Sequence, residues 1–196
     1  MSDIICVTNR KLCSGDLLTQ IARLAKAAPR AIILREKDMP EEEYRELAGK
    51  ALAICENAGV SLILHSFTDT AISLGCYDIH LPLPMLRGLT EEKKKSFLRL
   101  GTSVHSIEEA KEAQELGCTY ITAGHVFETD CKRGLPGRGL VFLKNVCDST
   151  ELPVYAIGGI TPDNIKSVRA CGVAGACIMS SAMICREASE LLGEFL

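Results

Sequence analysis

The chain has 196 residues, a hydrophobic fraction of 47% and a formal net charge of −3. This length and composition suit one core, so we expect a single domain over residues 1–196. The charge excludes the basic surface that nucleic acids and acidic membranes require, and no apolar run approaches the roughly 20 residues of a membrane span.

The first residues and the cysteines indicate a cytoplasmic protein. Met1-Ser2-Asp3 lacks the basic start and the long apolar stretch of a signal peptide. The sequence has ten cysteines but no CxxC pair and no Cys/His cluster at the spacing of metal ligands. Unpaired cysteines within apolar patterns behave as small hydrophobic residues and fit a reducing compartment. We therefore expect neither disulfides nor a structural metal site.

Short apolar runs alternate with longer amphipathic segments along the whole chain. The runs are rich in Ile, Val and Leu and show little alternation with polar residues, which is typical of parallel strands buried on both faces. We predict eight strands, at Ile4–Val7, Ala31–Leu34, Ser61–Leu64, Asp78–Leu81, Leu98–Thr102, Thr119–Ala123, Val154–Ile157 and Ala174–Met179.

Helical patterns fill the segments between these strands. Residues 44–55 and 107–116 place apolar side chains three and four positions apart, which is one face of a helix. Ser106 with Glu109 predicts a capping box, and Thr161-Pro162 predicts another helix start. Eight such units predict a (β/α)8 TIM barrel in the α/β class, near the short end of that fold, about 200 residues. An open, doubly wound sheet is the alternative.

In either fold, ligands bind where the parallel strands end. Gly158-Gly159 follows the seventh strand and lets backbone N–H groups approach an anion, while Ser180-Ser181 opens the last helix after the eighth. These ends predict a phosphate site, although the glycines also fit a simple tight turn. Arg35, Lys37 and Lys132 add positive charge after the second and sixth strands.

Histidines follow three of the predicted strands, namely His65, His105 and His125. Histidine accepts and returns a proton near neutral pH, and the loop from Gly124 to Lys132 favours His125 for this task. His80 lies within the fourth apolar run and is interpreted as structural. Because the third and fourth strand ends carry no acids, the pattern predicts a metal-free proton-transfer site for a phosphorylated small molecule.

Three stretches in the right order resemble the thiamine phosphate synthase/TenI family. They are residues 34–37 (LREK), 101–106 (GTSVHS) and 156–162 (AIGGITP). The resemblance covers essentially the whole chain and implies a TIM barrel and, by family precedent, a homodimer. It also implies one of two activities. The synthase joins a pyrimidine diphosphate to a thiazole phosphate with Mg²⁺, and the tautomerase aromatises a carboxythiazole phosphate without metal or redox cofactor.

Two departures from the synthase pattern favour the tautomerase. The synthase carries Asn-Asp and Glu-Asp after the third and fourth strands, where this chain has His65-Ser66 and Pro84-Met85. The sixth-strand loop, GHVFETDCK, is similar to the tautomerase loop. The resemblance then implies His125 and His105 as catalytic residues. It implies substrate and phosphate contacts at Arg35, Lys37, Ser103, Thr129, Lys132, Gly158, Gly159, Met179 and Ser180.

Two alternatives remain open at this point: a Mg²⁺-dependent thiamine phosphate synthase, and a non-catalytic regulator of the same fold that binds a phosphorylated ligand. The main expectation is a cofactor-independent thiazole tautomerase, an isomerase of thiamine biosynthesis. Its partner is a small phosphorylated thiazole, with no nucleic acid and no membrane.

Overall fold

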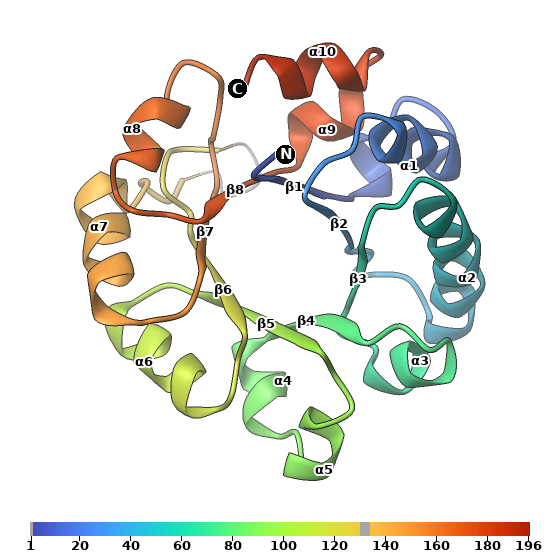
Figure 1. Ribbon diagram of the computed structural model, residues 1–196, viewed down its shortest axis with the longest axis horizontal. Helices are drawn as coiled ribbons and strands as arrows, with labels where there is room; N and C mark the ends of the chain where they lie inside the picture. Colours follow the sequence, from blue (N-terminus) through green and yellow to red (C-terminus); the bar gives the residue numbers. More distant parts are fainter. Residues whose placement is uncertain (1, 130–133) are drawn as a thin grey trace. The chain divides into compact units, whose positions relative to one another are not determined.

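The computed structural model describes residues 2–129 and 134–196, and their strands pair in parallel as one closed barrel in the order β1 to β8 (Figure 1). This confirms the predicted (β/α)8 barrel and excludes the open sheet. The strands are β1 (Ile4–Val7), β2 (Ala31–Leu34), β3 (Leu62–His65), β4 (Asp78–Pro82), β5 (Arg99–Val104), β6 (Tyr120–Gly124), β7 (Val154–Ile157) and β8 (Gly175–Ile178).

Helices alternate with these strands along the described chain. They are η1 (Arg10–Leu12, a 3-10 turn), α1 (Leu17–Lys26), α2 (Glu41–Asn57), α3 (Thr68–Ser73), α4 (Leu83–Arg87), α5 (Glu91–Lys94), α6 (Ile107–Glu115), α7 (Gly139–Ser149), α8 (Ile165–Arg169), α9 (Ser180–Ile184) and α10 (Ala188–Gly193). Among the residues described, no helix has both the length and the apolar character needed to cross a bilayer.

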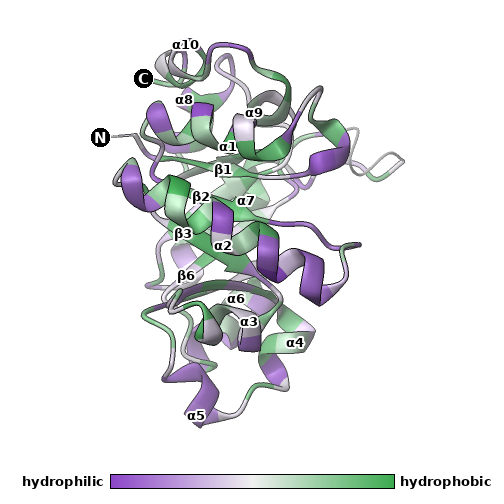
Figure 2. Cartoon of the chain, turned by 90° about the vertical axis from the view of Figure 1, so that its right-hand side faces the viewer, coloured by the Kyte–Doolittle hydropathy of each residue, from purple (hydrophilic) through white to green (hydrophobic). Residues whose placement is uncertain are grey.

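Internal contacts group the chain into two units, which we describe in turn. The first unit comprises Met1–His80 with Ile178–Leu196, and the second comprises Leu81–Cys177. In the first unit every residue of β1, β2 and β3 is buried, as continuous apolar runs predict. The strands β2 and β3 are accordingly green in Figure 2, whereas α2 carries a hydrophilic face.

The two ends of the chain pack together within the first unit. In α1, Gln20 Nε2 donates to the carbonyl O of Ala182 at 2.8 Å and to that of Cys185 at 3.0 Å. Helix α10 packs against α1, and Phe195 just beyond α10 is fully buried. Three apolar residues of the C-terminal segment, Ala188, Leu192 and Phe195, therefore belong to the core of their own chain.

In the second unit, β5, β6 and β7 are paired in register, with Thr102 opposite Ile121 and Ala123 opposite Ala156. The predicted cap at Ser106 is confirmed, because its Oγ accepts from the backbone N of Glu109 at 3.1 Å. The helix start predicted at Thr161 is wrong.

Helix α8 begins at Ile165 because the preceding residues form a turn instead. The backbone N of Thr161 donates to Asn164 Oδ1 at 2.9 Å, and Asn164 Nδ2 donates to the carbonyl O of Gly159 at 2.8 Å. The Asn164 side chain thus ties this turn to the glycine pair after β7.

Candidate functional site

The ends of β2 and β3 and the middle of β4 form one row in the first unit. Leu34 pairs with Leu64, so Arg35 and His65 follow side by side, and His65 pairs with His80. Arg35 is also tied to the first strand, since its backbone N donates to Thr8 Oγ1 at 2.9 Å. Parallel strands thus bring together groups from four segments of the sequence, around Thr8, Arg35, His65 and His80. We call this row of residues the edge of the first unit.

Glu36 fixes the cationic segment at this edge and is only 2% exposed. Its Oε1 accepts from Thr8 Oγ1 at 2.7 Å, and its two carboxylate oxygens accept from the backbone N of Arg10 at 3.1 and 3.0 Å. The Arg10 guanidinium adds an ion pair to Oε2 at 3.2 Å. A buried carboxylate is stable only with such partners. These partners anchor Glu36, and the anchored Glu36 fixes the backbone position of its two neighbours, Arg35 and Lys37.

His65 and His80 form a buried pair of neutral imidazoles, with ring centroids 5.8 Å apart and planes 24° from parallel. Burial, together with the neighbouring His80, Arg35 and Lys37, lowers the pKa of His65 to about 2. Burial, with Arg35 and Lys37, likewise lowers the pKa of His80 to about 3. Both rings therefore remain uncharged at neutral pH.

Ser66 follows this pair in a left-handed backbone conformation, with φ of 72°, which is uncommon for a residue with a side chain. Its Oγ lies 2.7 Å from His65 Nδ1, and its backbone N donates to the carbonyl O of His80 at 3.1 Å. The sequence placed His65 and Ser66 at a strand end but assigned them no role.

In the second unit, the segment after β6 lies against the glycine pair after β7. Val126 N donates to the carbonyl O of Ile157 at 2.9 Å, and Phe127 N donates to that of Gly158 at 3.0 Å. A Cβ on Gly158 would lie 2.4 Å from His125 Cβ, and one on Gly159 would lie 2.6 Å from the carbonyl O of Glu128. Both glycines also have positive φ. Close packing and backbone conformation therefore each favour glycine at these two positions, and neither reason involves a ligand.

His125 is 8% exposed, and its Nε2 lies 3.3 Å from the carbonyl O of Leu135. A proton on Nε2 would be donated to this carbonyl and would leave Nδ1 with a lone pair. The chain returns beyond the undescribed residues to the same place, where Arg138 N donates to the carbonyl O of His125 at 3.0 Å. The structure therefore brings His125 and Gly158 together, as the sequence predicted for one strand-end region.

The remaining predicted residues are distributed over both units. His105 Nδ1 lies 3.2 Å from Glu109 Oε2, and Ser103 Oγ accepts from Thr122 Oγ1 at 3.0 Å, both in the second unit. Thr129 is the last residue described before the gap, and Lys132 lies outside the described residues. Met179 and Ser180 belong to the first unit, where Met179 precedes the five-residue helix α9.

The described residues do not provide the donors of a divalent metal site. They contain no group of three or more His, Cys, Asp or Glu side chains placed to hold an ion. At the edge of the first unit, the oxygens of Glu36 are already occupied, and the third strand ends in a neutral imidazole and a hydroxyl. Mg²⁺ prefers carboxylate oxygens and water, so these groups do not fit it.

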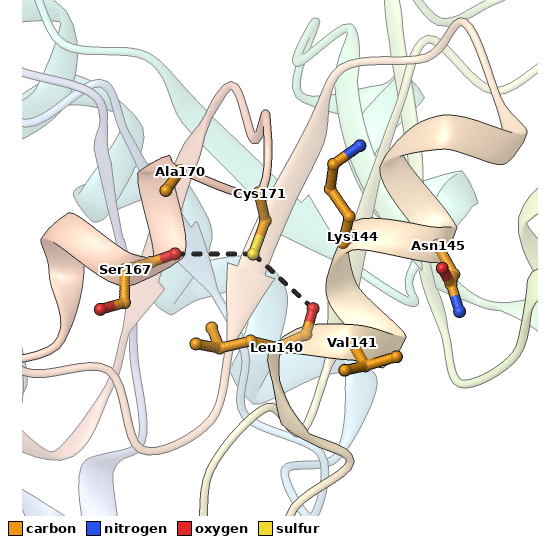
Figure 3. A pocket seen from close by; sticks show the side chains of 7 residues that line it. All are labelled: Leu140, Val141, Lys144, Asn145, Ser167, Ala170 and Cys171. Atoms are coloured by element: carbon orange, nitrogen blue, oxygen red, sulfur yellow. Dashed lines mark hydrogen bonds between the residues drawn. The ribbon is translucent and has the colours of Figure 1, made fainter.

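A hollow of about 450 Å³ lies between helices α7 and α8 in the second unit (Figure 3). Its lining includes Leu140, Lys144 and Cys171, and the Cys171 thiol donates to the carbonyl O of Leu140 at 3.6 Å. None of the residues predicted for the site lines this hollow.

Comparison with known proteins identifies the relatives of the chain. The profile of the family described as "Thiamine monophosphate synthase" matches residues 4–182. The chain is 32% identical over 195 residues to the "Thiamine-phosphate synthase" of Syntrophomonas wolfei, covering 96% of this chain and 90% of that protein. It is 34% identical over 183 residues to the protein of the same name from Clostridium acetobutylicum, covering 90% and 85%.

A solved structure shows the same relationship. The thiamine phosphate pyrophosphorylase of Pyrococcus furiosus superimposes with a TM-score of 0.85 at 27% identity, covering 98% of this chain and 92% of that one.

The expected thiazole tautomerase activity, and with it the isomerase class, is therefore wrong. The relatives described above carry the name of the synthase or of a thiamine phosphate pyrophosphorylase. The expectation relied on the single loop GHVFETDCK and on the absence of acids at two strand ends. Similarity over the whole chain outweighs both features.

Proposed function

We propose that this chain, which belongs to the thiamine monophosphate synthase family, is a transferase that forms thiamine phosphate from a pyrimidine diphosphate and a thiazole phosphate. In this reaction the thiazole ring nitrogen forms a C–N bond to the pyrimidine methylene carbon. The C–O bond to the diphosphate breaks, and diphosphate leaves with the electron pair. The catalyst must therefore stabilise negative charge on a departing diphosphate.

The observation that supports this function is the cationic edge of the first unit. Arg35 and Lys37 flank an anchored Glu36 whose own charge is satisfied by Thr8 and Arg10. Two cations fixed at the carboxyl ends of parallel strands suit a diphosphate. Burial is the main cause of the lowered pKa values of His65 and His80, and the charges of Arg35 and Lys37 lower them in addition.

The other predicted contacts stay with this proposal as substrate contacts. Ser103, Thr129, Lys132, Gly158 and Gly159 are assigned to the thiazole phosphate. Met179 and Ser180, in the first unit, stay predictions as substrate contacts. His105 and His125 are assigned to positioning the substrate rings, because the joining reaction as written requires no histidine base. Although resemblance to the synthases implies Mg²⁺, the described residues do not fit this ion, so we route no step through it.

The proposal is tested by supplying both substrates to the purified chain and measuring thiamine phosphate and released diphosphate. We expect both products in equal amounts. Arg35→Gln should lower the rate about 100-fold, the typical cost of removing one donor to a developing anion. Arg45→Gln is the matched control, since Arg45 lies on α2 in a surface pair with Glu42.

Two results would contradict the proposal. One is the absence of product at every Mg²⁺ concentration, including none. The other is tight binding of both substrates without turnover at enzyme excess, which would identify the chain as a non-catalytic binder of phosphorylated ligands.

A further inference from the structure

Two carboxylates next to Arg35 and Lys37 in the first unit, those of Glu36 and Asp38, already have partners. Both oxygens of Glu36 already accept hydrogen bonds. Asp38 pairs with Lys11 at 2.6 Å and with Arg10 at 2.8 Å. A divalent cation entering here would meet the charges of Arg35 and Lys37, and it would have to displace these partners to gain Glu36 or Asp38 as a ligand.

The third strand end supplies hydrogen-bond donors instead. Ser66 Oγ lies 2.7 Å from His65 Nδ1, and the Ser66 side chain is half-buried at the edge. When His65 carries its proton on Nδ1, it donates to Ser66 Oγ, and the serine O–H is then directed to another acceptor. His65 stays neutral in the field of Arg35 and Lys37, so it performs this role without adding charge.

The backbone at Ser66 is consistent with a ligand contact. A left-handed conformation is unfavourable for a residue with a Cβ, and such strain gathers at sites that clamp ligands. Two interactions hold the conformation, namely the bond from Ser66 N to the carbonyl O of His80 and the bond to His65. Glycine would adopt the same backbone without strain, yet the hydroxyl is present.

We infer that Ser66, oriented by His65, donates to a diphosphate held by Arg35 and Lys37, so that this chain binds diphosphate without a divalent metal ion. The inference rests on the proposed function for the identity of the ligand. The serine hydroxyl and the two cations together stabilise the negative charge of the diphosphate, which a metal ion would otherwise neutralise. Anion binding favours the His65 tautomer that leaves the serine proton available.

The test is a calorimetric titration of inorganic pyrophosphate into the full chain, in EDTA and separately in excess Mg²⁺. We expect binding in EDTA that Mg²⁺ does not strengthen. Ser66→Gly, which removes the hydroxyl and suits the backbone, should weaken binding in EDTA about 10- to 100-fold, the value of one hydrogen bond to a charged group. Ser73→Ala is the control, because Ser73 lies on α3 and bonds only its own helix, at Thr70 O.

A second variant reverses the expected metal dependence. Ser66→Asp places a carboxylate against the anion, so pyrophosphate should bind only when Mg²⁺ is present. The inference is overturned if the unmodified chain requires Mg²⁺, if it binds no pyrophosphate in either buffer, or if the Ser66 variants bind like the unmodified chain.

These outcomes are separable from those of the proposed function, because binding is measured without turnover. Pyrophosphate bound in EDTA by a chain that makes no thiamine phosphate would leave the inference standing and remove the function. If the chain forms thiamine phosphate only with Mg²⁺ and binds pyrophosphate only with Mg²⁺, the proposed function stands and the inference of metal-free binding is overturned.

Discussion

At the scale of single residues, His65 and His80 link the candidate site to the stability of the fold. Both imidazoles are buried, and their pKa values in the folded chain are about 2 and about 3, compared with an ordinary value of 6.5. The unfolded chain therefore binds more protons than the folded chain whenever the pH lies between these values. Stability is complete above about pH 6.5 and is lost as the pH falls toward the folded pKa values.

We expect acid to destabilise the chain well before its carboxylates are protonated. Each histidine should lower the free energy of unfolding by about 1.4 kcal/mol per pH unit below 6.5. Asp38, whose pKa its bonds to Lys11 and Arg10 lower to about 2, responds only in stronger acid. Urea unfolding at pH 6.5, 5.5 and 4.5 measures the slope.

His65→Gln and His80→Gln are matched variants for this measurement. Each should remove about half of the slope with pH, whatever its effect on stability at pH 7, and the double variant should remove nearly all of it. An unchanged slope in both single variants would show that other groups cause the acid sensitivity.

The sequence indicated the cations of this edge but not the residue that fixes them. Arg35 and Lys37 follow an evident strand, so their place could be predicted from the pattern. The pattern assigns no role to Glu36 between them. Its burial depends on Thr8 and Arg10, which lie 28 and 26 positions away in the chain. Such tertiary contacts leave no local signal, and the same holds for the backbone strain at Ser66.

At the scale of elements, the loop after β6 and the turn after β7 form one packed structure. The segment from His125 to Glu128 lies against Gly158 and Gly159, and its backbone donates hydrogen bonds to the carbonyl O of Ile157 and of Gly158. The strands themselves were predictable because each is a continuous apolar run. The glycines were read as an approach for phosphate, but the structure supplies a packing reason that requires no ligand. Phosphate binding there stays a prediction.

Replacing Gly158 separates this packing from backbone strain. Gly158→Ala should destabilise the chain by roughly 3 kcal/mol or more, because the new methyl group would overlap His125 in addition to adopting a positive φ. Gly172→Ala is the control, since Gly172 has φ of 88° but no heavy atom within 4 Å of an added Cβ.

The two variants are compared by thermal unfolding. The control should cost about 1–2 kcal/mol, and its melting temperature should fall by only a few degrees. Equal shifts for both variants would mean that the loop gives way easily, and that His125 is not held by the glycine pair.

At the scale of the whole molecule, the first unit is built from both ends of the chain. Residues 178–196 join residues 1–80 through bonds such as that from Gln20 to Ala182, whereas the second unit is continuous in sequence. The pattern of apolar runs predicts eight repeats but does not show that the last of them shares a core with the first. We propose that the chain nevertheless unfolds as the single domain expected from its length.

Phe195 provides the test of this single domain. Its side chain is 1% exposed, whereas that of the neighbouring Leu196 is 86% exposed. Phe195→Ala should cost about 3–5 kcal/mol and lower the melting temperature by roughly 10 °C, while Leu196→Ala should change little.

Because Phe195 lies in the first unit, the informative measurement is amide hydrogen exchange in the second unit. If the chain is one cooperative domain, Phe195→Ala will accelerate exchange in the slowest amides of β5, β6 and β7 as much as in those of β1 to β3. Acceleration confined to the first unit would show that the two units unfold separately.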